Sequence, residues 1–168
     1  MDGLVGSEMC IRDSSEGAPV SPVTLRKLLR GTTEAWLRCG TAEGSVKVNG
    51  RTYQGIVHLI NRGEGWIAVN EINMERYVAS VVGAEMPSGW NEEALKAQAV
   101  AARSYGLVHL IRPASPDWNL GDTTRWQVYA GQASSTARTL KATEDTRGLV
   151  LSHHCLLYTS DAADDELG

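Results

Sequence analysis

The 168-residue chain contains no phenylalanine, although it has five tryptophans and five tyrosines. Its largest aromatic side chains therefore all carry a polar atom. No apolar run approaches the roughly 18 residues that a membrane-spanning helix needs. The sequence therefore predicts no transmembrane segment.

Cysteine is also scarce, and two of the three cysteines lie in segments that resemble translated DNA-library primers. These segments read LVGSEMCIRDS (4–14) and CLLYTSDAAD (155–164). We interpret residues 1–14 and 154–168 as adaptor-derived, the alternative being two genuine polar tails. Only Cys39 then remains, and one thiol can form neither an internal disulfide nor a cysteine zinc cluster.

The charge balance depends on the same segments. Setting them aside removes one of 16 basic and seven of 20 acidic residues, so the formal net charge changes from −4 to +2. A near-neutral balance favours neither a nucleic-acid partner nor an acidic tail that recruits one.

The remaining chain predicts an α+β domain over residues 44–153. Residues 15–43 read as a linker or a ragged domain start, and the domain is expected to be truncated at its C-terminus. An antiparallel β meander comes first, with Asn49-Gly50 as a two-residue hairpin turn, a strand over 51–59, and a Gly-rich turn at 63–65 before the strand 66–69. Its expected inward-facing residues are Val46, Val48, Tyr53, Val57, Leu59, Ile67 and Val69.

Two helices with an acidic loop between them follow the meander. The 3.6-residue apolar period predicts a first helix over 74–82, ended by Gly83. Asn91 caps a second helix that runs to about Ile111, with Glu92 and Lys96 as an i, i+4 pair. A strand near 127–129, a third helix over 136–146 closed by Gly148, and a strand from Leu149 complete the prediction.

Glu85 stands out chemically on the loop that we expect between the first two helices. Apolar neighbours such as Met86 and Trp90 would favour its protonated form. A protonated carboxyl is the group that glycoside cleavage uses on a leaving oxygen. Taken alone, an ordinary exposed loop glutamate explains the same residue.

Ordered motifs over about 100 residues resemble the SpoIID/LytB (stage II sporulation protein D) family. They include YQG (53–55), VNEINMERYVASVVGAE (69–85), EMP-x-x-W followed by EALKAQAVAARSY (85–105), and DTTRWQVYAG (122–131).

The resemblance implies a peptidoglycan lytic transglycosylase that cleaves MurNAc–GlcNAc glycan strands to 1,6-anhydro products. It implies that Glu85 is the general acid and then the general base. Candidate substrate contacts are Arg103, Tyr105, Gln127 and Tyr129. An arginine on the solvated helix face is an equally plausible reading of Arg103, and Tyr105 is as plausibly a core residue. Glu75 or Asp122 could only pair with Glu85 if the fold brought them to it.

The resemblance also bears on metals, partners and location. Some family members bind zinc through two cysteines and a histidine, but Gly121 and Trp126 stand at the cysteine positions here. We therefore expect no metal and no cofactor, with His58 and His109 structural. The implied partners are glycan strands and a cell-wall amidase, and the implied location is the cell envelope. Two alternatives are a non-catalytic glycan-binding module that enhances an amidase, as in LytB-type members, and a structural piece of a larger envelope protein.

Overall fold

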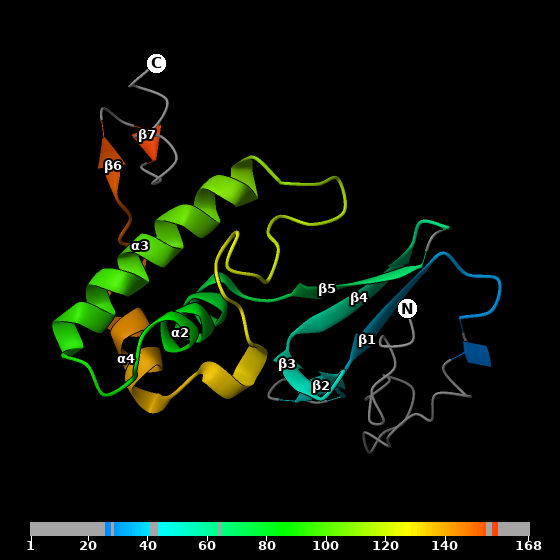
Figure 1. Cartoon of the computed structure of the whole chain (residues 1–168), viewed down its shortest axis with the longest axis horizontal. Coiled ribbons are helices and arrows are strands. Elements are labelled where there is room, and N and C mark those ends of the chain that lie inside the picture. Colours follow the sequence, from blue (N-terminus) through cyan, green and yellow to red (C-terminus); the bar gives the residue numbers. More distant parts are fainter. Residues whose placement is uncertain (1–25, 28, 41–43, 64, 154–155, 158–168) are drawn as a thin grey trace. The chain divides into compact units, whose positions relative to one another are not determined.

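A computed structural model of the chain describes residues 26–27, 29–40, 44–63, 65–153 and 156–157. The expected adaptor-derived residues 1–14 and nearly all of 154–168 lie outside these ranges. The chain forms two compact units, with their boundary between Asn73 and Met74. The predicted α+β class is confirmed, because antiparallel strands come first and helices follow (Figure 1). The predicted domain 44–153 includes residues of both units.

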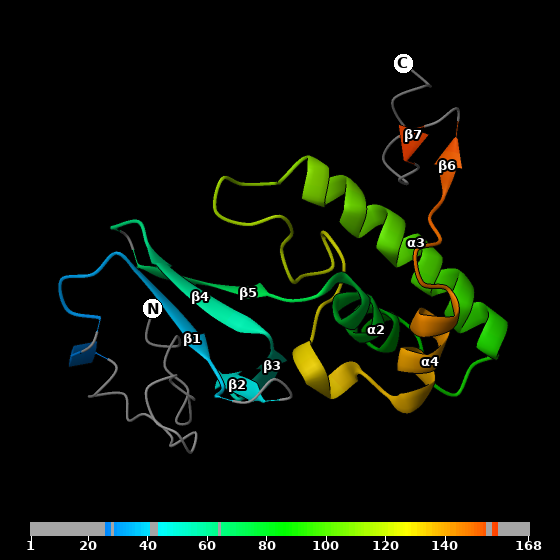
Figure 2. The ribbon, with the colours of Figure 1, turned by 180° about the vertical axis from the view of Figure 1, so that it is seen from behind.

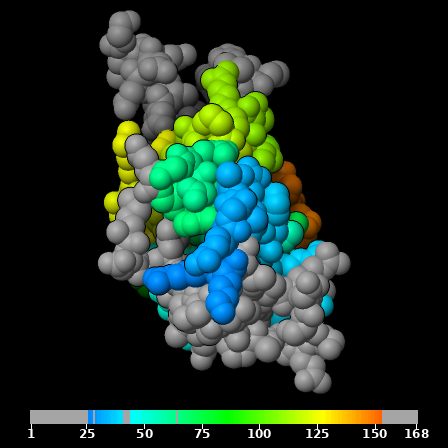
Figure 3. Space-filling view, turned by 90° about the vertical axis from the view of Figure 1, so that its right-hand side faces the viewer, coloured from blue at the N-terminus to red at the C-terminus, as the bar shows by residue number. Residues whose placement is uncertain are grey.

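The first unit contains a three-stranded antiparallel sheet and a separate hairpin. The sheet has the order β1 (Glu34–Arg38), β4 (Ile56–Asn61), β5 (Trp66–Glu71). The hairpin consists of β2 (Ser45–Val48) and β3 (Arg51–Gln54). In Figure 3, residues of β1 in blue lie beside blue-green residues of the β4–β5 hairpin, as the pairing requires.

The predicted two-residue turn between β2 and β3 is confirmed. Asn49 and Gly50 have φ angles of 51° and 78°, and Val48 lies opposite Arg51. Positive φ at both central positions is the type I′ geometry, whose twist matches that of paired strands. Asn and Gly tolerate this backbone conformation better than other residues.

The single strand predicted over 51–59 is instead two strands, β3 and β4. Gly55 separates them with a φ angle of 82°, and a Cβ at this position would lie 2.2 Å from the Glu71 carbonyl oxygen. The chain therefore turns at Gly55 and passes close to the end of β5. Only glycine combines that φ with so close a backbone contact.

The strand β1 lies inside residues 15–43, for which we expected a linker or a ragged domain start. Its residues Glu34–Arg38 pair in register with Ile56–Ile60 of β4. These five residues therefore belong to the sheet of the first unit. A strand of five residues with one strongly buried side chain gives too short an alternation to recognise without its partner.

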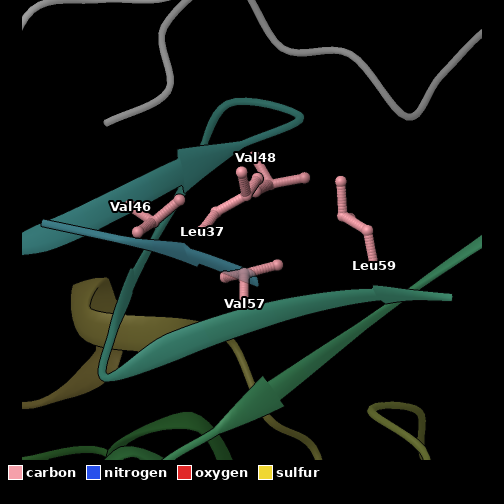
Figure 4. Close-up of a cluster of buried hydrophobic side chains, with 5 residues drawn as sticks. All are labelled: Leu37, Val46, Val48, Val57 and Leu59. Carbon is pink, nitrogen blue, oxygen red and sulfur yellow. The ribbon is translucent and has the colours of Figure 1, made fainter. Parts of the chain in front are cut away.

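The apolar core of the first unit lies between the sheet and the hairpin. Five buried side chains point toward one another there (Figure 4): Leu37, Val46, Val48, Val57 and Leu59. Four of them were predicted. Two further residues expected to face inward do not, because Ile67 is 36% exposed and Val69 is only half-buried. Ile67 pairs with Ile60 and Val69 with His58, and alternation puts these on the sheet face opposite to Val57 and Leu59.

The second unit is built from three helices. They are α2 (Met74–Glu85), α3 (Glu92–Ile111) and α4 (Ala137–Asp145), and each packs against the other two (Figures 1 and 2). A 3₁₀ helix, η1 (Gly131–Ser134), packs on α2. Two short strands, β6 (Ser152–His153) and β7 (Leu156–Leu157), pair after α4. The strand predicted near 127–129 is wrong, since those residues form no ladder, and the strand expected from Leu149 begins only at Ser152.

Gly83 does not end α2 as predicted, because the helix continues to Glu85. A Cβ at Gly83 would lie 1.9 Å from the Ser134 carbonyl oxygen and 2.9 Å from its carbonyl carbon. The glycine is therefore required by the close approach of η1 rather than by a helix end. As a consequence, Glu85 is the last residue of α2 and not a loop residue.

The predicted helix signals hold for α3 and α4. The Asn91 Oδ1 accepts a hydrogen bond of 2.8 Å from the Glu93 N–H, and α3 ends two residues before Pro113. Thr136 and Thr139 form a capping box at the start of α4. Gly148, at φ 75°, follows its end. None of the described helices combines the length and apolar character needed to cross a membrane.

Candidate functional site

The carboxylate of Glu85 is held by one hydrogen-bond donor on each oxygen. The Gln98 Nε2 donates to Oε2 at 2.7 Å, and the Val128 N–H donates to Oε1 at 3.2 Å. Glu85 itself is exposed to solvent. Three segments thus meet at this group: the end of α2, the second turn of α3 and the loop before η1.

These contacts differ from the apolar surroundings that we expected for Glu85. Met86 is half-buried, whereas Trp90 is 53% exposed. The Trp90 carbonyl accepts a 2.6 Å hydrogen bond from Arg138 Nη2, and Arg138 Nη1 donates to the Ser88 carbonyl at 2.6 Å. The loop after Glu85 is therefore anchored by α4 through its backbone.

A tyrosine that the sequence analysis missed lies beside this site. The Tyr77 hydroxyl donates to Gln127 Oε1 at 2.9 Å, and its ring lies 5.4 Å from that of Tyr129. Burial raises the pKa of Tyr77 well above its usual range, and the nearby charge of Glu85 raises it further. Tyr77 therefore remains a protonated hydrogen-bond donor at neutral pH.

The predicted contacts Gln127 and Tyr129 flank Val128, so the structure does bring them near Glu85. Both are almost fully buried, at 7% and 8% exposure. They therefore anchor the segment that carries the Val128 N–H. Little of either side chain is open to a ligand.

Tyr105 lies on α3 and is half-buried. Its ring centroid is 4.6 Å from that of His109, which lies 5.3 Å from the ring of Trp126. A charge on Tyr105 would also raise the pKa of Tyr77, so the two tyrosines are electrostatic neighbours. Tyr105 thus links Tyr77 of the candidate site to the aromatic cluster that Tyr105 forms with His109 and Trp126.

Arg103 is placed in the interior of the second unit rather than beside Glu85. It is 3% exposed, and its guanidinium forms a two-pronged ion pair with Glu75, with Nε–Oε1 at 3.0 Å and Nη2–Oε2 at 2.6 Å. It also donates to the carbonyls of Leu149 and Thr143. This network does not fit the prediction that Arg103 contacts substrate, and it also engages Glu75, one of the two carboxylates considered as a partner for Glu85.

The sequence carried partial signals for the residues that we missed. Tyr77 and Glu85 are eight residues apart on α2, about 2.2 turns, and so lie on adjacent sides of the helix. Gln98 is the uncharged polar residue in the alanine-rich stretch AlaLeuLysAlaGlnAla. The Val128 contribution is a backbone N–H, for which side-chain identity gives no signal.

The two positions compared with zinc-binding cysteines lie together. A Cβ on Gly121 would be 2.5 Å from Trp126 Cδ1, so the indole ring packs directly over the glycine. The ring of His109 meets the same indole edge-on. Among the described residues there is no group of three or more His, Cys, Asp or Glu side chains placed to hold a metal ion.

Comparisons with known proteins agree on one family. The family model described as "SpoIID: Stage II sporulation protein" matches residues 62–153. An uncharacterized protein of Brachyspira hyodysenteriae is 40% identical over 101 residues, which is 60% of this chain and 27% of that protein. The amidase enhancer of Bacillus subtilis is 42% identical over 80 residues, 48% of this chain and 10% of that protein.

Stage II sporulation protein D of Bacillus subtilis is 39% identical over 70 residues, 39% of this chain and 20% of that protein. The chain therefore spans about a tenth to three tenths of the length of these relatives.

Proposed function

The chain belongs to the SpoIID family, and from this membership and the surroundings of Glu85 we propose that it is a peptidoglycan lytic transglycosylase. Its substrate is the glycan strand of alternating GlcNAc and MurNAc, and Glu85 is the catalytic residue. The observation that supports this most directly is the solvent-facing carboxylate fixed by Gln98 and the Val128 N–H.

In the first step, the protonated Glu85 gives its proton to the oxygen that joins MurNAc to GlcNAc. The bond between C1 of MurNAc and that oxygen breaks, and the oxygen leaves with GlcNAc as a hydroxyl. The C6 hydroxyl oxygen of the same MurNAc then attacks C1, and its proton passes to the Glu85 carboxylate. The product is a 1,6-anhydro sugar, and Glu85 ends in its starting protonation state.

This reaction requires only one carboxylate. The attacking hydroxyl belongs to the substrate, so proximity replaces an activated water. Hydrolases, in contrast, place a second carboxylate at a defined spacing. The engagement of Glu75 with Arg103 is compatible with a single-carboxylate mechanism.

The alternative function is a glycan-binding module that enhances an amidase without cleaving the strand. A relative whose name is amidase enhancer shares 42% identity over 80 residues with this chain and supports this candidate. The exposure of Glu85 also fits a residue that binds sugar hydroxyls without transferring a proton. Both candidates share the same proposed partner, the glycan strand, and the same proposed location in the cell envelope. An amidase is the further protein partner that we propose.

The two functions make different products. We expect the chain to release fragments with anhydro ends from purified glycan strands, with and without stem peptides, as detected by mass spectrometry. Glu85→Gln keeps the size of the side chain, but it replaces one accepting oxygen by an NH2 group and cannot transfer a proton. We therefore expect a loss of anhydro products of about 100-fold or more.

Glu144→Gln provides a matched control, because Glu144 is an exposed glutamate on α4 that pairs with Arg147. It should cleave like the wild type. Co-sedimentation of intact strands with both the wild type and Glu85→Gln, without anhydro ends, would contradict the enzyme and support the binding module.

A further inference from the structure

We infer that Gln98 is a positioning residue that, together with the Val128 N–H, fixes the plane of the Glu85 carboxylate. This inference rests on the proposed function of Glu85. Each oxygen of the carboxylate accepts one hydrogen bond, and the two donors come from different segments. With one donor on each oxygen, rotation of the carboxylate about its last side-chain bond would break both hydrogen bonds.

The first donor is carried by a rigid element. Gln98 lies in the second turn of a 20-residue helix that is capped by Asn91. Its neighbours Leu95, Ala99 and Ala102 are fully buried, so the helix cannot shift without disturbing packed side chains. Gln98 itself is half-buried, which limits its rotamers and leaves its amide at the surface beside Glu85.

The second donor is held in place by its neighbours. Gln127 and Tyr129, on either side of Val128, are buried, and Tyr77 of α2 donates to the Gln127 side chain at 2.9 Å. The Tyr129 N–H reaches the Asp122 carbonyl at 3.4 Å. The Val128 N–H is therefore directed at Glu85 from a loop that is hydrogen-bonded, through Gln127, to the helix that carries Glu85, α2.

This arrangement explains how an exposed glutamate can serve as an acid and a base in turn. Both donors leave a second lone pair on each carboxylate oxygen, where the proton can be held and released. A reacting group displaced by about 1 Å loses on the order of 100-fold in rate. Gln98 thus acts through Glu85 and need not touch the glycan.

The test replaces Gln98 in the full chain and measures kcat and KM for anhydro-product formation. Gln98→Met keeps the length of the side chain and removes the donor. We expect kcat to fall about 10- to 100-fold while KM stays within about twofold, because ground-state binding is unchanged. Gln98→Lys keeps a donor and should recover part of the lost kcat.

Gln132→Met is the matched control, since Gln132 is an exposed glutamine in η1. It should keep the kcat and KM of the wild type. A Gln98→Met variant with wild-type kcat would overturn the inference. So would a variant in which only KM rises, because that pattern indicates a direct contact with the glycan.

A measurement without turnover separates this inference from the proposed function. In the ¹³C spectrum of the Glu85 carboxyl carbon, Gln98→Met should change the chemical shift of that carbon at a fixed pH, because the hydrogen bond from Gln98 Nε2 is lost. If the wild type forms no anhydro products but this signal moves, the proposed function fails and the positioning contact stands. If the signal of Gln98→Met matches that of the wild type, the contact itself is refuted.

Discussion

Among the described residues, the guanidinium of Arg103 donates to both oxygens of Glu75, to the Leu149 and Thr143 carbonyls and to the Thr146 hydroxyl. It is 3% exposed, and Glu75 is mostly buried as well. Removing one partner of a buried, hydrogen-bonded ion pair is strongly destabilising. Arg103 therefore stabilises the helical unit, a role that competes with the predicted contact to substrate.

Arg103→Met should lower the free energy of unfolding by about 3–5 kcal/mol, because it removes one partner of a buried ion pair and the donors to the Leu149 and Thr143 carbonyls. Urea denaturation followed by circular dichroism measures this change. Arg112→Met serves as the control, since Arg112 is exposed at the end of α3, and it should change stability by about 0.5 kcal/mol or less. If Arg103→Met has the free energy of unfolding of the wild type but binds glycan more weakly, the result would instead support a contact between Arg103 and the substrate.

At the scale of the elements, α2 and η1 approach so closely that only glycine fits at position 83. Intrinsic helix propensity alone favours Gly83→Ala by about 1 kcal/mol. The added Cβ would, however, lie 1.9 Å from the Ser134 carbonyl oxygen, so one backbone must move. Overpacking of this kind typically costs about 1–3 kcal/mol, and we expect it to outweigh propensity.

Gly106→Ala provides the comparison within α3. The nearest atoms to a Cβ there are Met74 Sδ and Tyr77 Cε1, both at 3.3 Å, and both are side-chain atoms that can shift. Thermal unfolding should therefore show a clear loss of Tm for Gly83→Ala and a smaller change for Gly106→Ala. Equal or higher stability of Gly83→Ala would mean that the approach of η1 is looser than the structure has it.

The helices α3 and α4 are linked by an exposed group of charges. Lys141 Nζ lies 2.7 Å from Glu92 Oε1 and 2.6 Å from Asp145 Oδ2, and Lys96 lies 3.5 Å from both carboxylates. Hydrogen bonding to Lys141 is the largest cause that lowers the pKa of Glu92 and of Asp145. The same contacts raise the pKa of Lys141.

These shifts predict how the stability changes with pH. A carboxylate with a lowered pKa contributes its full stabilisation above its ordinary value, 4.5 for Glu and 3.8 for Asp. The contribution is lost as the pH falls through the lowered values. Lys141→Met should thus lower Tm by about 1–3 °C at pH 6 and low salt, and the difference should disappear near pH 2. A difference that persists at pH 2 or in about 1 M salt would show that packing, not charge, links the helices.

For the whole molecule, the sequence predicted the elements with strong local signals. The Asn49-Gly50 turn, the Asn91 cap and the end of α3 before Pro113 each depend on a few neighbouring residues. The prediction was wrong where a distant segment decides the local structure. Gly83 was read as a helix end because its partner Ser134 is 51 residues away in the chain, and β1 was missed because β4 supplies its hydrogen bonds.

The same distinction between local signals and distant contacts applies to the candidate site. Glu85 could be proposed from the sequence because its side chain and motif mark it. The Gln98 contact and the buried setting of Gln127 and Tyr129 depend on how α2, α3 and the loop before η1 pack. The Val128 donor belongs to the backbone and could come from any residue type. The proposal of Glu85 as the catalytic residue therefore came from the sequence, whereas the groups that hold its carboxylate are visible only in the structure.

The strand order β1-β4-β5 determines how much chain entropy is lost when the loops of the sheet close on folding. Pairing β4 with β5 closes a loop of only four residues, 62–65, whereas pairing β1 with β4 closes one of 17, 39–55. The longer closure costs about 1 kcal/mol more in chain entropy. The β2–β3 hairpin occupies ten of those 17 residues, so forming it first shortens the flexible part of the loop. The entropic cost of pairing β1 with β4 thus depends on a hairpin that shares an apolar core with β1 but pairs with neither strand.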